Sequence, residues 1–247
     1  MVAWLMAGGG YSELRMPLFL QKHFPSCRFE RQLPIRQRSP LPYKAGEKGS
    51  LSGLGRTGKS FIPQLRERLQ ELLQRSDHRP DFLFILDDLD CRDHKLAQGA
   101  IETVLSEMNC DLDCIVGFAA PEVEAWLVAD WDGTFGRCSK FKGHHVAMRY
   151  TLATRGINFE HPEQFSSMDD STGSCRDKLS QWLDDAHLQY FSKGHFSKKE
   201  DTPELLMCAD PQIIARKAPL FCRFWQELTD RYQILLMDGS GKGFPLQ

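Results

Sequence analysis

The segment "FLFILDDLDCRD" (residues 82–93) constrains the fold more than any other part of this 247-residue chain. It opens with five apolar residues and then carries four aspartates. An apolar run this short, bounded by Pro80 and Asp87, is typical of a strand buried on both faces. Such strands lie in parallel sheets covered by helices, so the segment predicts an α/β fold.

Two further apolar segments, at residues 2–7 and 114–119, predict strands of the same sheet, and residues 28–33 alternate between polar and apolar side chains as a strand does. Between them, residues 61–74 and 95–107 repeat apolar side chains at helical spacing. Strands that alternate with helices predict a Rossmann-like, mostly parallel sheet flanked by helices. A further helix is expected to open at Pro121.

After about residue 135 we expect no more strands, and the pattern is helical. The expected helices are residues 179–188, 203–207, 211–218 and 221–232. We therefore predict an α/β domain at residues 1–135, with a mainly α-helical C-terminal extension at 136–247 packed on it. Trp126 and Trp225 lie in apolar helical patterns and are expected in the core.

Charge is divided along the chain, although its formal net charge is only −2. Residues 28–75 hold 11 Lys/Arg against 4 Asp/Glu, and residues 77–130 hold 3 against 13. Pro- and Gly-rich residues 34–60 predict a long basic loop, suited to sequence-independent contact with a nucleic-acid backbone. The basic side chains expected to make that contact are Arg36, Arg38, Lys44, Lys48, Arg56 and Lys59.

The same loop contains "GLGRTGKS" (Gly53–Ser60), which matches the phosphate-binding P-loop pattern. That motif requires a strand directly before it, and the preceding residues are polar and interrupted by Gly and Pro. We therefore favour a basic loop over an ATP site, in which Lys59 would contact the phosphates.

The eight cysteines are scattered, with no C-x-x-C pair, and predict free thiols in a reducing cytoplasm rather than a zinc site. The N-terminus lacks a basic leader, and no apolar run approaches the roughly 18–20 residues of a membrane-spanning helix. We expect a cytoplasmic protein without a membrane partner.

Acidic side chains follow three of the predicted strands. Asp87, Asp88 and Asp90 follow residues 82–86, and Glu122 and Glu124 follow residues 114–119. A further acid, Glu13, comes after the glycine turn that ends the first strand. Ligands of α/β sheets bind at the carboxyl ends of the strands, and carboxylates suit Mg²⁺. These positions therefore predict a Mg²⁺ or Mn²⁺ site.

Within that site, an extended segment would turn Asp88 and Asp90 to the same side. The alternatives are that aspartates after a strand cap the next helix or form a solvated loop, and that Glu122 favours a helix N-terminus. Carboxylates this dense repel one another, which favours a bound cation or a basic partner over those alternatives.

The order of "GGGYSE", "FILDDLDCRD" and "PEVEAWLVAD" resembles TOPRIM-like proteins, the catalytic fold of topoisomerases, DnaG-type primases and overcoming-lysogenization-defect nucleases. The chain is most similar to the prokaryotic domain-of-unknown-function family 4276 (DUF4276), in which an E-A-W-L-x-A-D segment is characteristic. The later "YFSK" and "TPELLMCADPQIIARKAPLFCRFWQEL" also resemble that family, so the likeness covers most of the chain.

The resemblance implies roles for individual residues. Asp88 and Asp90 would be the D-x-D metal ligands with Asp87 secondary, and Glu124 would complete the site, helped by Glu122. The first TOPRIM motif normally opens with a glutamate; this sequence has Gly9 there and keeps the second glutamate, Glu13. Either Glu13 takes the metal or acid–base role, or the domain binds without cutting.

Two functions follow from the resemblance. The first is a Mg²⁺-dependent nuclease acting on DNA or RNA, with Glu13, Asp88, Asp90 and Glu124 catalytic, as an effector of anti-phage defence. The second is a catalytically degenerate binding or sensor subunit of a complex with a separately encoded ATPase.

Overall fold

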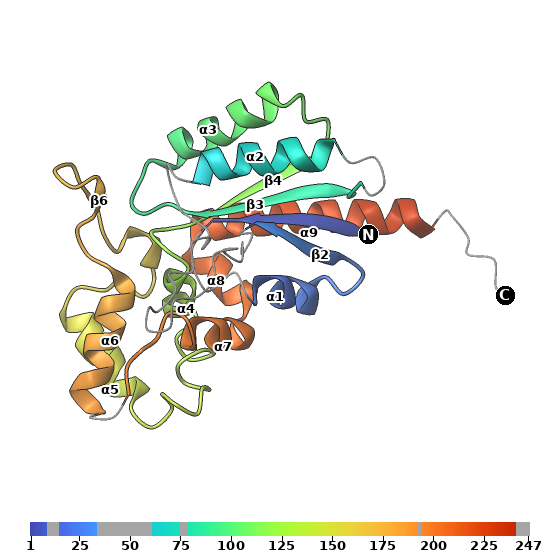
Figure 1. The fold of residues 1–247 in the computed structure, drawn as a ribbon. Coiled ribbons are helices and arrows are strands. Elements are labelled where there is room, and N and C mark those ends of the chain that lie inside the picture. The colour runs from blue at the N-terminus through green and yellow to red at the C-terminus, as the bar shows by residue number, and fades with distance from the viewer. Residues whose placement is uncertain (9–14, 34–60, 75–78, 192–193, 241–247) are drawn as a thin grey trace, which may run out of the picture.

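A computed structural model describes residues 1–8, 15–33, 61–74, 79–191 and 194–240 (Figure 1). Its main sheet has four parallel strands in the order β2-β1-β3-β4. The strands are β1 (Val2–Ala7), β2 (Arg28–Leu33), β3 (Phe82–Asp88) and β4 (Cys114–Ala119). The predicted strands and the predicted α/β class are confirmed.

Side chains of alternate residues cover the two faces of this sheet, because successive strand residues point to opposite sides. Trp4 and Met6 pack with α2 (Phe61–Leu73) and α3 (His94–Glu107), which confirms both predicted helices. Their neighbours Ala3, Leu5 and Ala7 belong to the core on the other face, with α1 (Met16–His23) and α9 (Pro219–Ser240). Figure 1 shows α2 and α3 on one side of the sheet and α1 and α9 on the other.

The C-terminal part is helical, as predicted. Its helices are α4 (Glu124–Ala129), α5 (His145–Thr154), α6 (Leu179–Tyr190), α7 (Asp201–Cys208), α8 (Pro211–Lys217) and α9, with a short 3₁₀ helix at Pro162–Gln164. Helix α9 lies directly against β4: a Cβ atom on Gly117 would stand 2.9 Å from the ring of Phe224. Trp126 and Trp225 are buried, at 0% and 7% exposure, which confirms their predicted core positions.

Two expectations about this part were wrong. A short antiparallel hairpin follows residue 135, formed by β5 (Met168–Asp169) and β6 (Ser174–Cys175), and the sequence did not indicate it. In addition, Cys91 and Cys175 form a disulfide instead of remaining free thiols. Because the two cysteines are 84 residues apart, local sequence spacing could not predict that they pair. The fold brings the hairpin to the loop after β3.

Among the described residues, no helix combines the length and apolar character needed to cross a membrane.

Candidate functional site

The candidate site starts at the carboxyl end of β3, where Asp87 and Asp88 are both buried. In the parallel register Asp88 lies opposite Ala119, the last residue of β4, so the chain leaving β4 passes beside it. Asp87 is occupied: its Oδ2 accepts a 2.7 Å hydrogen bond from Arg92. Asp87 was expected to be a secondary metal ligand, but its negative charge is balanced by Arg92.

Gly8 makes room for Asp87 at the end of the neighbouring strand. A Cβ atom at residue 8 would stand only 2.3 Å from Oδ1 of Asp87, well inside any real contact distance. The glycine after β1 is therefore required by the close approach of this carboxylate.

Asp90 interacts electrostatically with Asp88, but it is not held there by an extended strand as expected. Strand β3 ends at Asp88, and Asp90 has a φ of +48°, so the extended alternation that would align it with Asp88 is absent. Its neighbour Cys91 is also left-handed, with a φ of +63°, and the chain turns away from the strand direction there. Asp93 caps α3 by accepting the Leu96 amide, which was one of the alternatives for this acidic run.

Glu122 and Glu124 are buried beside Asp88. Pro121 does not open a helix, contrary to expectation; α4 begins at Glu124. The carbonyl of Pro121 accepts the amide of Asp90 instead of continuing into a helical turn. This bond joins the chain after β4 to the loop after β3, and it brings the two acidic segments together.

A lysine from the C-terminal part lies among these acids. Nζ of Lys198 is 2.6 Å from Oε2 of Glu122 and 2.9 Å from Oε2 of Glu124. Asp88 also interacts electrostatically with it. Three carboxylates thus share one ammonium group, leaving a formal charge of −2 when all four groups are ionised.

Two further donors from the C-terminal part fix the glutamates. The hydroxyl of Thr202 donates to Oε1 of Glu124 at 2.7 Å, and the amide of Ser180 donates to Oε1 of Glu122 at 2.9 Å. Each glutamate therefore has one oxygen hydrogen-bonded to a neutral donor and the other facing Lys198. In the described residues, no hydrogen bond reaches the carboxylate of Asp88.

The two residues that precede Lys198 are held by backbone hydrogen bonds. The amide of Phe196 donates to Asp184 at 2.8 Å, and the amide of Ser197 donates to Asp201 at 2.6 Å. Asp201 also binds the ammonium of Lys140 at 2.7 Å. The segment before α7 is therefore anchored, and Lys198 enters the acidic cluster from a fixed backbone.

The pKa values follow from burial and charge. Burial raises the pKa of Asp88 well above its usual value, Lys198 opposes the shift, and the neighbouring carboxylates add to it. Burial likewise raises the pKa of Glu124, which interacts with Lys198, Glu122 and Thr202. For Lys198, burial lowers the pKa, but the three carboxylates outweigh burial and raise it above its usual value. The lysine is therefore charged.

Asp88 also lines a small cavity with Ala7, Gly8, Met16, Leu86, Ala119 and Val123. Its volume is about 10 Å³, enough for about one water-sized particle.

The donor set suits a hard divalent cation, because all three acids offer oxygen. Within the described residues, however, no three Asp, Glu, His or Cys side chains are already arranged to hold a metal ion. Lys198 lies between the glutamates where such an ion would bind. Some of the predicted site lies outside the described residues: Glu13 and the basic side chains Arg36, Arg38, Lys44, Lys48, Arg56 and Lys59.

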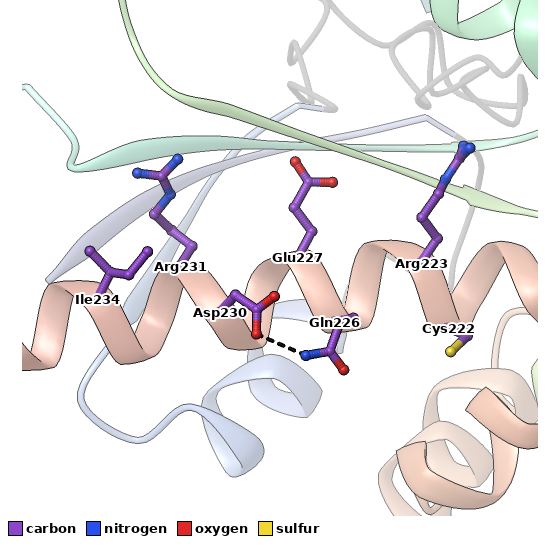
Figure 2. A pocket seen from close by; sticks show the side chains of 7 residues that line it. All are labelled: Cys222, Arg223, Gln226, Glu227, Asp230, Arg231 and Ile234. Atoms are coloured by element: carbon purple, nitrogen blue, oxygen red, sulfur yellow. Dashed lines mark hydrogen bonds between the residues drawn. The ribbon is translucent and has the colours of Figure 1, made fainter.

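A separate groove of about 540 Å³ lies along α9, and its lining includes none of Asp88, Glu122 and Glu124. It is lined by Cys222, Arg223, Gln226, Glu227, Asp230, Arg231 and Ile234. Figure 2 shows Arg223, Glu227 and Arg231 extending from α9 toward the same side. Arg231 forms an ion pair with Asp113 at 2.6 Å. The lining of this groove contains none of the predicted site residues.

Sequence reasoning missed Arg92, Ser180, Lys198 and Thr202. Only Arg92 had a local signal, since it lies within the acidic run. No protein-family model, curated protein or solved structure matches the chain.

Proposed function

We propose that this chain is a Mg²⁺- or Mn²⁺-dependent nuclease whose metal is held by Asp88, Glu122 and Glu124, with Glu13 as a further ligand. The observation that carries the proposal is the buried carboxylate of Asp88. It has no hydrogen bond within the described residues, lines a water-sized cavity and lies beside two glutamates that share one lysine. Burying that much negative charge is costly unless a cation balances it.

The protein's own residues would position and balance the reaction. Ser180 and Thr202 orient Glu122 and Glu124, while Arg92 pairs with Asp87. A divalent cation supplies water activation and charge stabilisation on a phosphodiester. The basic residues of 34–60 would hold the DNA or RNA backbone, a contact that weakens as salt rises.

Asp88→Asn tests the proposal, because it keeps the side-chain shape and removes the charge. We expect cleavage of DNA or RNA in Mg²⁺ or Mn²⁺ to fall by about a hundredfold or more, given that metal-dependent charge stabilisation contributes several kcal/mol. Glu163→Gln is the matched control: Glu163 is a half-buried carboxylate whose pKa is raised by burial, but it accepts the amides that begin α9. A folded Asp88→Asn protein that cleaves at the wild-type rate would refute the proposal.

The second candidate is a non-cutting subunit that binds nucleic acid or a separately encoded ATPase. Lys198 favours it, because a residue of the chain already balances part of the acidic charge. Retention of labelled DNA or RNA without cleavage, together with no calorimetric signal at millimolar Mn²⁺, would identify this function. An anti-phage role belongs to either candidate and is testable by phage plaque counts in cells expressing the chain.

A further inference from the structure

We infer that Lys198 is an internal substitute for the metal ion, so that divalent-cation binding displaces its ammonium group from Glu122 and Glu124. The inference deepens the proposed function and rests on the metal site proposed there. Lys198 acts here as a positioning residue: it keeps the two glutamates assembled when no metal is bound.

The contacts of Lys198 resemble those of a bound cation. Its Nζ lies 2.6 Å and 2.9 Å from oxygens of two different glutamates, and Asp88 adds a third attractive charge. Thr202 and Ser180 occupy the remaining glutamate oxygens. A metal that takes Oε2 of Glu122 and Oε2 of Glu124 must therefore take both atoms that the ammonium contacts.

The environment also allows the ammonium to leave. The side chain of Lys198 is 30% exposed, whereas that of Glu124 is fully buried. The flexible lysine side chain can thus swing toward water while the glutamates stay in place, held by Thr202 and Ser180. The backbone of Lys198 need not move, since Asp184 and Asp201 anchor its neighbours.

If the ammonium of Lys198 competes with the metal ion for Glu122 and Glu124, removing it should strengthen Mn²⁺ binding, which the loss of a purely structural lysine would not do. Lys198→Met removes the competing ammonium, so Mn²⁺ should bind tighter by at least about fivefold, the lower end of usual coupling between two ligands. Lys198→Gln keeps a hydrogen-bond donor for the glutamates and serves if the Met protein does not fold. Lys217→Met is the control, because Lys217 is similarly covered, at 21% side-chain exposure, and pairs with Glu160. It should leave Mn²⁺ affinity unchanged.

Calorimetric titration of the full chain with Mn²⁺ separates the outcomes. Tighter binding by either Lys198 variant, with Lys217→Met unchanged, supports the inference. Wild-type binding combined with equal or weaker binding by the folded Lys198 variants overturns it and leaves the proposed function standing. Absence of Mn²⁺ binding at millimolar concentration in every protein overturns both.

Amine labelling of the wild-type chain provides a second test. Acetylation of Lys198, followed by mass spectrometry, should increase when Mn²⁺ is added, since the released ammonium becomes accessible. Acetylation of Lys217 should not change. If Mn²⁺ binds and the labelling of Lys198 stays constant or falls, displacement is refuted.

Discussion

The hydroxyl of Thr202 donates a 2.7 Å hydrogen bond to Oε1 of Glu124, joining residues 78 positions apart in the chain. Both residues are fully buried, so water cannot replace this bond if it is lost. The C-terminal part therefore completes the hydrogen bonding of an acid that belongs to the α/β part.

Thr202→Val should lower the free energy of unfolding by about 1–3 kcal/mol, the usual cost of leaving a buried acceptor without its donor. Urea denaturation at pH 7 measures the change. Thr202→Ser retains the hydroxyl and should lose distinctly less. A Ser protein that loses as much stability as the Val protein would contradict the assignment of the loss to the hydrogen bond.

Two glycines should respond in opposite ways to alanine. Gly8→Ala places a Cβ 2.3 Å from Asp87 and should lower the free energy of unfolding by about 1–3 kcal/mol, as overpacking does. Gly99 lies inside α3 with no atom within 4 Å of its added Cβ. Gly99→Ala should therefore raise stability by roughly 0.5–1 kcal/mol. Denaturant midpoints of the two variants check both signs, and a stable Gly8→Ala protein would contradict the close approach.

The disulfide between Cys91 and Cys175 should stabilise the folded chain. Cys175→Ser should lower the free energy of unfolding by roughly 2–5 kcal/mol. The unfolded chain gains conformational freedom once residues 84 positions apart are no longer joined. Adding dithiothreitol to the wild type should reproduce that loss. Cys222→Ser, at an exposed free cysteine, is the control. If the reductant leaves wild-type stability unchanged, the cross-link does not contribute.

A pair of histidines, the buried His187 and the half-buried His144, predicts acid sensitivity. Nε2 of His144 and Nδ1 of His187 lie 2.8 Å apart, and burial lowers the pKa of both below the usual 6.5. The unfolded chain then binds more protons than the folded chain, so this contribution is present above about pH 6.5 and is lost as the pH falls.

His187→Leu should remove much of that dependence. Between pH 7.5 and 5, the free energy of unfolding of the wild type should fall more steeply than that of the variant. The raised pKa values of Asp88 and Glu124 act in the opposite direction but are common to both proteins. The exposed His161, replaced by Ala, is the control. Parallel pH profiles for the wild type and His187→Leu would contradict the prediction.

The strands were predictable because their signal is local. Residues 82–86 are apolar throughout, and a strand buried on both faces needs little else. From the strand ends, the sequence also placed Asp88, Glu122 and Glu124 near one another. Those three positions follow from a parallel sheet, in which the carboxyl ends of neighbouring strands lie at one edge.

The rest depended on contacts that sequence spacing does not encode. Lys198 lies 76 residues from Glu122, and only the packing of the helical part brings them together. Asp90 departs from the strand direction because its backbone is left-handed. The carbonyl of Pro121 accepts a hydrogen bond from the Asp90 amide, and no helix opens at Pro121. Local patterns therefore identified the acids but not what neutralises them.

The origin of the partners of Glu122 and Glu124 sets a limit on how this protein can be recombined. Asp88, Glu122 and Glu124 come from the first 135 residues, whereas Ser180, Lys198 and Thr202 come from the remainder. A chimera that inherits only the first portion would carry three buried acids without the ammonium and the two donors that accommodate them. We therefore expect the two portions to be inherited together in evolution, and substitutions among these residues to be correlated.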